Sequence, residues 1–159
     1  MRPTIRRAVA TALDHTLIAL LAALAVALLT MLGALGIYTY LPSFHAIAEE
    51  FAVDATVVQQ TLSIYVLGLA LMMLVYGTLS DAIGRRRVLL LAASGYCLAS
   101  LLAALSPNIE TLIALRAAQG LMAGAGMVVS RAMVQDRYQG AQAQRMLAMI
   151  MVVFSLAPA

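Results

Sequence analysis

The stretch GTLSDAIGRRRVLLLA, residues 77–92, lies between two long apolar segments and contains an aspartate, two glycines and three consecutive arginines. In a chain with so few charges, this concentration indicates a connection between two helices at a membrane surface. The stretch is either an ordinary charged loop or an element with a function of its own. The rest of the chain decides between these two interpretations.

The composition predicts an all-α membrane protein. The chain has 159 residues, of which 64% are hydrophobic and 11% are charged, whereas soluble domains use about 25% charged residues. The net charge of +3 comes from scattered arginines without any lysine, which excludes a nucleic-acid-binding surface. A single cysteine, Cys97, excludes a disulfide framework. We expect no cofactor, no metal and no enzymatic activity, because His15 and His45 fall on opposite sides of the membrane and no catalytic constellation occurs.

Apolar segments occur at about 17–41, 57–79, 88–105, 111–134 and 146–159. About 20 residues of helix cross the hydrocarbon core, so the first four are predicted spans, and the first is too long for a signal peptide. The absence of period-2 alternation excludes a barrel. The last segment offers only about 21 Å of helix. We therefore expect a fragment, with a cytoplasmic segment at 1–16 and a partial transmembrane domain at 17–159.

Arginines occur in every second connection between the predicted spans. They precede the first span, separate the second from the third, and follow the fourth. The connections 42–56 and 106–110 hold no basic residue, and their acidic residues are Glu49, Glu50, Asp54 and Glu110. Because positive charge accumulates on the cytoplasmic side, the N-terminus and the connections near 80 and 140 are predicted to be cytoplasmic, in a bacterial-type inner membrane.

The residues of the opening stretch are spaced for more than a charged loop. Asp81 lies at the C-terminal end of the second span, where the helix dipole disfavours a carboxylate. It therefore needs a cation, and Arg85 lies four residues further along the chain. Gly77 and Gly84 permit close helix approach and a tight turn. The positive-inside rule explains the arginines but not this combination.

The fourth predicted span carries a polar stripe, RAAQGLMAGAG at residues 116–126. Arg116 inside a span costs roughly 2.5–3.5 kcal/mol at the bilayer centre, unless its side chain extends outward to the headgroups. Gln119 and Gly120 share its helix face, and Gly120 and Gly124 form a GxxxG pair that admits another helix. We expect this stripe to face the helix bundle as the wall of a cavity.

These motifs resemble those of the major facilitator superfamily. The pattern G-x-L-[SA]-D-x-x-G-R-[RK] is matched by Gly77, Leu79, Ser80, Asp81, Gly84, Arg85 and Arg86, with Ala82 at a usually basic position. Arg116, Gln119 and Gly120 match the family's R-x-x-Q-G motif, which implies a role in proton coupling. YLPSF (40–44), VSRAMVQD (129–136) and FSLAPA (154–159) are similar to Bcr/CflA-type bicyclomycin-resistance transporters.

The resemblance implies an exporter of small amphipathic or drug-like molecules by proton antiport. The full protein would have about twelve spans in two six-helix halves, so a missing C-terminal part is an implied partner beside the lipid bilayer. The resemblance also implies that Asp136 is a charge partner at the end of the fourth span. Tyr38, Tyr40 and Pro42 would lie along the substrate path.

Two departures from the family pattern affect proton coupling. Tyr38 occupies a position that is often acidic in such transporters, and a phenol carries protons poorly at neutral pH. Gln135 replaces a residue that is usually basic. Proton coupling therefore rests on the resemblance alone. Two other readings stay open, a small four-span exporter acting as a dimer and a non-transporting membrane fragment.

Overall fold

The computed structural model describes residues 28, 30, 31 and 33–155, and over these residues the chain is helical without any strand. Residues 28, 30, 31 and 33–38 are helical. They are followed by a 3₁₀-helix and then by five α-helices: η1 (Leu41–Ser43), α2 (Phe44–Glu50), α3 (Ala55–Ile83), α4 (Arg85–Ala104), α5 (Ile109–Arg137) and α6 (Gly140–Ser155). The all-α fold class is confirmed.

Three of these helices, α3, α4 and α5, are long and apolar enough to cross a membrane. α3 and α5 contain the predicted segments 57–79 and 111–134 and extend beyond them at both ends. α4 begins before the segment 88–105 and ends one residue short of its end. α6 likewise begins at Gly140, before the apolar segment that starts at 146. The helices continue into polar residues because backbone hydrogen bonds do not depend on hydropathy. The predicted segment 1–16 and most of the first span lie outside the described residues.

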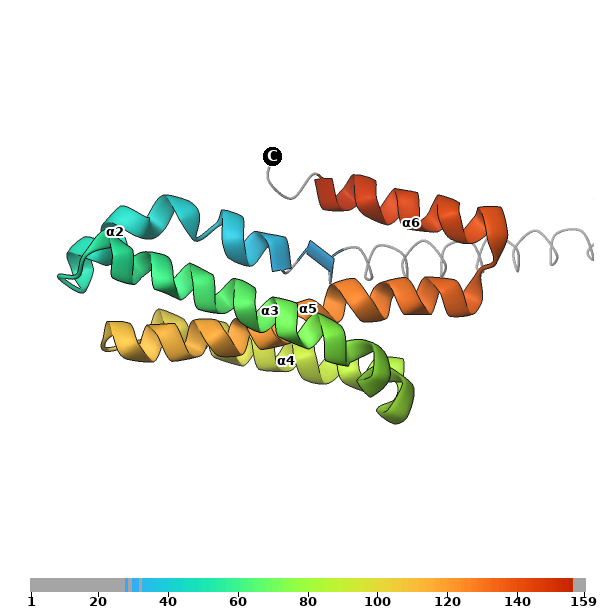
Figure 1. The fold of residues 1–159 in the computed structure, drawn as a ribbon, viewed down its shortest axis with the longest axis horizontal. Helices are drawn as coiled ribbons and strands as arrows, with labels where there is room; N and C mark the ends of the chain where they lie inside the picture. The colour runs from blue at the N-terminus through green and yellow to red at the C-terminus, as the bar shows by residue number, and fades with distance from the viewer. Residues whose placement is uncertain (1–27, 29, 32, 156–159) are drawn as a thin grey trace, which may run out of the picture.

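Helices α3, α4 and α5 lie side by side along their length, whereas α2 and α6 lie at opposite ends of the bundle (Figure 1). Two short connections join the three long helices, so their directions alternate. The core between them is a cluster of mostly aliphatic side chains from all three helices: Tyr76, Val88, Leu89, Ala92, Ala125 and Val129. This core holds α5 against both α3 and α4.

The expected loop at 42–56 is largely helical, which corrects that prediction. The chain passes from the helix at 33–38 through a turn into η1 and α2, and it leaves regular structure only at residues 51–54. Pro42 has no N–H to donate, and the amides of Tyr40 and Ser43 bond three residues back, to Ile37 and Tyr40. The proline therefore tightens the helix into a 3₁₀ turn rather than ending it.

Glycines bring α5 into backbone contact with α3. A Cβ atom added to Gly120 would lie 2.1 Å from the carbonyl oxygen of Tyr65, and one added to Gly124 would lie 3.2 Å from that of Leu69. At Gly120 only glycine fits so close an approach, and at Gly124 a side chain would make a tight contact. The Tyr76 hydroxyl further donates to the Leu121 carbonyl across the same interface, at 2.7 Å. The predicted approach of a helix to the GxxxG pair is confirmed, and the neighbour is α3.

Candidate functional site

Arg116 lies inside the bundle, with only 4% of its surface exposed. Its Nη1 donates to Gln119 Oε1 at 3.0 Å, and its Nη2 donates to the Gly36 carbonyl at 2.9 Å. The guanidinium carbon also lies 4.0 Å from the centre of the Tyr40 ring and 4.3 Å from that of Tyr65. Arg116 thus faces the bundle, as expected, and does not extend outward to the headgroups.

The polar contacts around Arg116 continue into α4. Gln119 Nε2 donates to Ser100 Oγ at 2.9 Å, and Ser100 Oγ donates to the Tyr96 carbonyl at 2.8 Å. The chain of contacts therefore runs from residue 36 through α5 to α4. It joins three segments that lie far apart in the sequence.

The aromatic partners of Arg116 are themselves anchored. The Tyr65 hydroxyl donates to the Gly33 carbonyl at 2.9 Å. The Tyr40 hydroxyl donates to Thr61 Oγ1 at 2.7 Å, because that threonine hydroxyl already donates to the Val58 carbonyl. These bonds hold the two rings close to the guanidinium, at distances typical of cation–π contacts.

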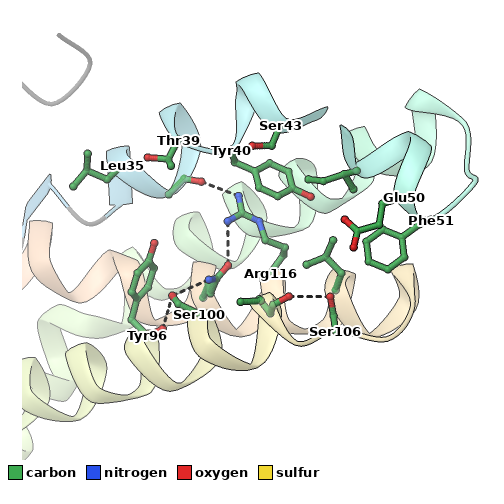
Figure 2. A pocket seen from close by; sticks show the side chains of 16 residues that line it. Leu35, Thr39, Tyr40, Ser43, Glu50, Phe51, Tyr96, Ser100, Ser106 and Arg116 are labelled. Atoms are coloured by element: carbon green, nitrogen blue, oxygen red, sulfur yellow. Dashed lines mark hydrogen bonds between the residues drawn. The ribbon is translucent and has the colours of Figure 1, made fainter. Parts of the chain in front are cut away.

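A cavity of about 580 Å³ opens beside this network. Its walls come from residues 35–51, from α4 and from the first part of α5, and they include Tyr40, Tyr96, Ser100, Arg116 and Gln119. Arg116 lies near the middle of the cavity in Figure 2, whereas Glu50 and Phe51 lie at the end away from Tyr96. Ligand pockets occupy about 300–1,000 Å³, so the cavity is large enough for a drug-like molecule.

A second polar cluster lies at the other end of the bundle, around the turn between α3 and α4. Arg85 Nη2 lies 2.6 Å from Asp81 Oδ1, and Arg85 Nε lies 3.1 Å from Asp136 Oδ2. Arg85 Nη1 also donates to Ser80 Oγ. A single arginine therefore holds together the end of α3, the start of α4 and the last turn of α5.

The turn itself depends on Gly84, which separates α3 from α4 with φ at +97°. Glycine adopts positive φ without the steric cost that other residues meet. Arg85 thus reaches Asp81 across a break in the helix rather than along one continuous helix. The expected tight turn at Gly84 is confirmed.

The remaining motif residues make fewer contacts within the described part of the chain. Leu79 packs against the core cluster, but no atom lies within 4 Å of a Cβ placed on Gly77, so the close approach expected there is absent from the described residues. Arg86 is exposed. Tyr38 and Pro42 are exposed and do not line the cavity.

Sequence reasoning missed several residues of the Arg116 network, namely Gly36, Tyr65, Tyr96 and Ser100. Gly36 leaves room for two tyrosines, since a Cβ there would lie 2.5 Å from the Tyr65 hydroxyl and 2.7 Å from that of Tyr96. The positions of tyrosines and glycines in different predicted spans do not indicate that these residues contact one another. Only the buried arginine could have indicated that polar partners were needed.

The match to known proteins agrees with this architecture. The sequence profile described as Major Facilitator Superfamily matches residues 26–159. The chain belongs to the Major Facilitator Superfamily. It is therefore a membrane protein of a transporter family, and the expected resemblance is confirmed.

Superfamily members similar to the chain include drug-resistance proteins. An uncharacterized MFS-type transporter of Bacillus subtilis is 44% identical over 131 residues, covering 82% of this chain and 33% of that protein. A bicyclomycin resistance protein homolog of Haemophilus influenzae is 33% identical, covering 85% and 34%. Multidrug resistance protein D of Escherichia coli is 34% identical, covering 72% and 29%. The chain spans about a third of the length of these relatives.

Proposed function

We propose that this chain forms part of a transporter that exports drug-like small molecules across the plasma membrane. The observation that carries the proposal is the cavity of about 580 Å³ beside a buried arginine, in a chain of the Major Facilitator Superfamily. The names of the Haemophilus influenzae and Escherichia coli relatives support drug-like substrates. Because those relatives are about three times longer, the missing partner is a further set of helices that completes the transport path.

The proposed topology has the N-terminus and the connections near 80 and 140 in the cytoplasm. The distribution of charge supports it, because arginines 85–87 and 137 lie at the α3–α4 and α5–α6 turns, whereas Glu49, Glu50, Asp54 and Glu110 lie toward the other end. Cysteine labelling from outside the cell tests it in a Cys97→Ala background. An Asp54→Cys variant should react with an impermeant maleimide, and an Arg86→Cys variant should not. The reverse pattern of labelling would invert the topology.

We further propose that export is coupled to proton entry, as the family resemblance implies. Among the described residues no carboxylate pairs with Arg116, so the proton-carrying group lies elsewhere in the complete transporter. Tyr38 and Pro42, which are exposed in this chain, would then border the substrate path shared with the missing helices. A protonophore should abolish export if protons drive it.

The cluster around Arg85 is proposed to hold the transporter in the state closed to the cytoplasm. The Asp81 carboxylate is 64% exposed despite its pairing with Arg85, so it is free to meet a positive helix N-terminus of the missing helices. Release of that contact would let the two halves move apart. A coupling free energy of about 1–3 kcal/mol is enough to shift the equilibrium between the states closed and open to the cytoplasm.

A chimeric protein tests both the export function and the role of Asp81. This chain would replace the matching third of the Haemophilus influenzae bicyclomycin resistance protein homolog, in an efflux-deficient host. The chimera should restore growth on bicyclomycin, and Asp81→Asn should abolish that growth while membrane insertion stays normal. Ala82→Arg is the matched control in the same turn and should be tolerated. Full resistance in the Asp81→Asn chimera would leave the turn with no role beyond topology.

The same host separates the two other readings. The chain expressed alone should confer no resistance. Resistance from the chain alone would support a small exporter that acts as a dimer. A correctly inserted chimera that never exports the drug would support a non-transporting fragment.

A further inference from the structure

The guanidinium of Arg116 carries a buried positive charge with only neutral partners. Its acceptors are the Gly36 carbonyl and the Gln119 side chain, and two tyrosine rings contact it. Its Nε is buried and has no hydrogen-bond partner among the described residues. Within residues 28, 30, 31 and 33–155 no carboxylate forms an ion pair with it. A buried cation in this situation is strongly disposed to bind an anion.

The cavity offers an anion access to this charge. Arg116 and its partner Gln119 are part of the cavity wall, together with the aromatic side chains of Tyr40 and Tyr96. Among the described residues that line the cavity, the one carboxylate belongs to Glu50, which is exposed at the end of the cavity beside Phe51 (Figure 2). Solvent screens an exposed charge far more than a buried one. The electrostatic character at the centre of the cavity is therefore positive.

We propose that this cavity binds amphipathic molecules through an anionic group, such as a carboxylate, placed against Arg116. The planar guanidinium presents N–H groups in a fork that matches two carboxylate oxygens, and Arg116 is one of the residues that line the cavity. The apolar body of the ligand then lies along Leu35, Ile47 and Leu112, which line the cavity. A ligand of the same shape with an ammonium group is rejected, since it would face the guanidinium.

As a statement about exported substrates, this inference rests on the proposed function. As a statement about a binding site, it requires no transport. The two can therefore fail separately. A selective site in a chain whose chimera does not export refutes only the proposed function, and an exporting chimera whose chain binds the probes without preference refutes only the inference.

The test uses three probes with one aromatic body and different charge: pyrenebutanoate, pyrenebutanol and pyrenebutylamine. The chain would be reconstituted into phosphatidylcholine nanodiscs, and probe binding would be measured by fluorescence anisotropy against empty nanodiscs. The anion should bind at least about tenfold more tightly than the alcohol, as a charge-assisted hydrogen bond gives, and the amine should bind most weakly. Equal affinities, or a preference for the amine, would overturn the proposal.

Variants assign the preference to Arg116. Arg116→Gln should bring the affinity for pyrenebutanoate down to that for pyrenebutanol. Arg131→Gln is the matched control, because Arg131 is an exposed arginine of the same helix that does not line this cavity. It should keep the full preference for the anion. Selectivity that survives Arg116→Gln, or that disappears in Arg131→Gln, places the anion site elsewhere and contradicts the proposal.

A third variant covers the case in which Arg116→Gln fails to fold. Ala103 lines the cavity and makes none of the Arg116 contacts. Ala103→Phe fills part of the space without changing charge, and it should weaken binding of the anion and of the alcohol together by about tenfold, the loss expected for a blocked pocket. Unchanged binding of both probes would show that they bind outside this cavity.

Discussion

Among the described residues, Arg116 and Arg85 lie at opposite ends of the bundle and are held in opposite ways. Arg116 is 4% exposed and contacts a backbone carbonyl, an amide and two aromatic rings. The Arg85 side chain is 24% exposed and contacts two exposed carboxylates. The first arginine has neutral partners in the interior, and the second has charged partners near water.

This difference separates two uses of the same side chain. A buried guanidinium that loses a partner leaves unpaired groups away from water, so its environment tolerates little change. An exposed ion pair is worth little, since water replaces either partner. The contacts of Arg116 are therefore costly to lose, whereas the ion pairs of Arg85 can separate at small cost. An alternating transporter needs both properties, but in different places.

The largest effect should come from packing next to Arg116. Gly120→Ala places a Cβ atom 2.1 Å from the Tyr65 carbonyl oxygen, so α3 and α5 must separate. We expect the free energy of unfolding to fall by about 3 kcal/mol or more, measured by SDS-induced unfolding in mixed micelles. Gly77→Ala is the control at the Arg85 end, where a Cβ meets no atom within 4 Å. If the free energy of unfolding fell equally in both variants, the two ends of the bundle would not differ in how tightly they pack.

Next in size is the loss of the buried arginine itself. Arg116→Leu removes the donors to Gly36 and Gln119 and both ring contacts. We expect the free energy of unfolding to fall by about 2–3 kcal/mol, in the same micelle titration. If Arg116→Leu unfolded at the same SDS fraction as the unchanged chain, the buried contacts of Arg116 would not stabilise the bundle more than the exposed ion pairs of Arg85 do.

A smaller effect is expected from the exposed ion pairs. Asp136→Asn removes one of the two carboxylates on Arg85, while Asp81 remains. The free energy of unfolding should fall by about 0.5 kcal/mol. Repeating the titration in 1 M NaCl should shrink this loss, because salt screens exposed charges, and should leave the effect of Arg116→Leu unchanged. If salt instead changed the loss of unfolding free energy caused by Arg116→Leu, the surroundings of Arg116 would be accessible to water.

The smallest effect should come from Arg86, which is exposed and forms no ion pair within the described part of the chain. Arg86→Gln should change the free energy of unfolding by less than about 0.5 kcal/mol. A loss as large as that of Asp136→Asn would mean that the second arginine of the motif also pairs with α5.

The sequence predicted the helices and the local contacts well. Apolar runs located α3, α4 and α5, and the four-residue separation of Asp81 and Arg85 indicated their contact. Hydropathy failed where polar residues were helical, as between Pro42 and Glu50, because a helix needs backbone bonds rather than apolar side chains.

The partners contributed by distant segments could be predicted only in part. The resemblance implied that Asp136 is a charge partner, but its contact with Arg85 depends on the place where α5 ends beside α4. The bond from Arg116 to Gly36 depends on how the first helical segment packs. No periodicity or spacing in a single sequence predicts contacts between segments that are distant along the chain. The motif residues showed that Arg116 needed partners, but only the packing of three segments shows which ones.

The bond between Arg116 and the Gly36 carbonyl has a consequence for how the chain is synthesised. It joins residues 80 positions apart, so the carbonyl end emerges from the ribosome well before the arginine. At 5–20 residues per second, the first helical segment waits in the membrane for roughly 4–16 seconds before its partner is made. During that interval the polar groups facing the future position of α5 are unmatched. The early helices are therefore most exposed to quality-control proteases and to mispairing before α5 has entered the bilayer.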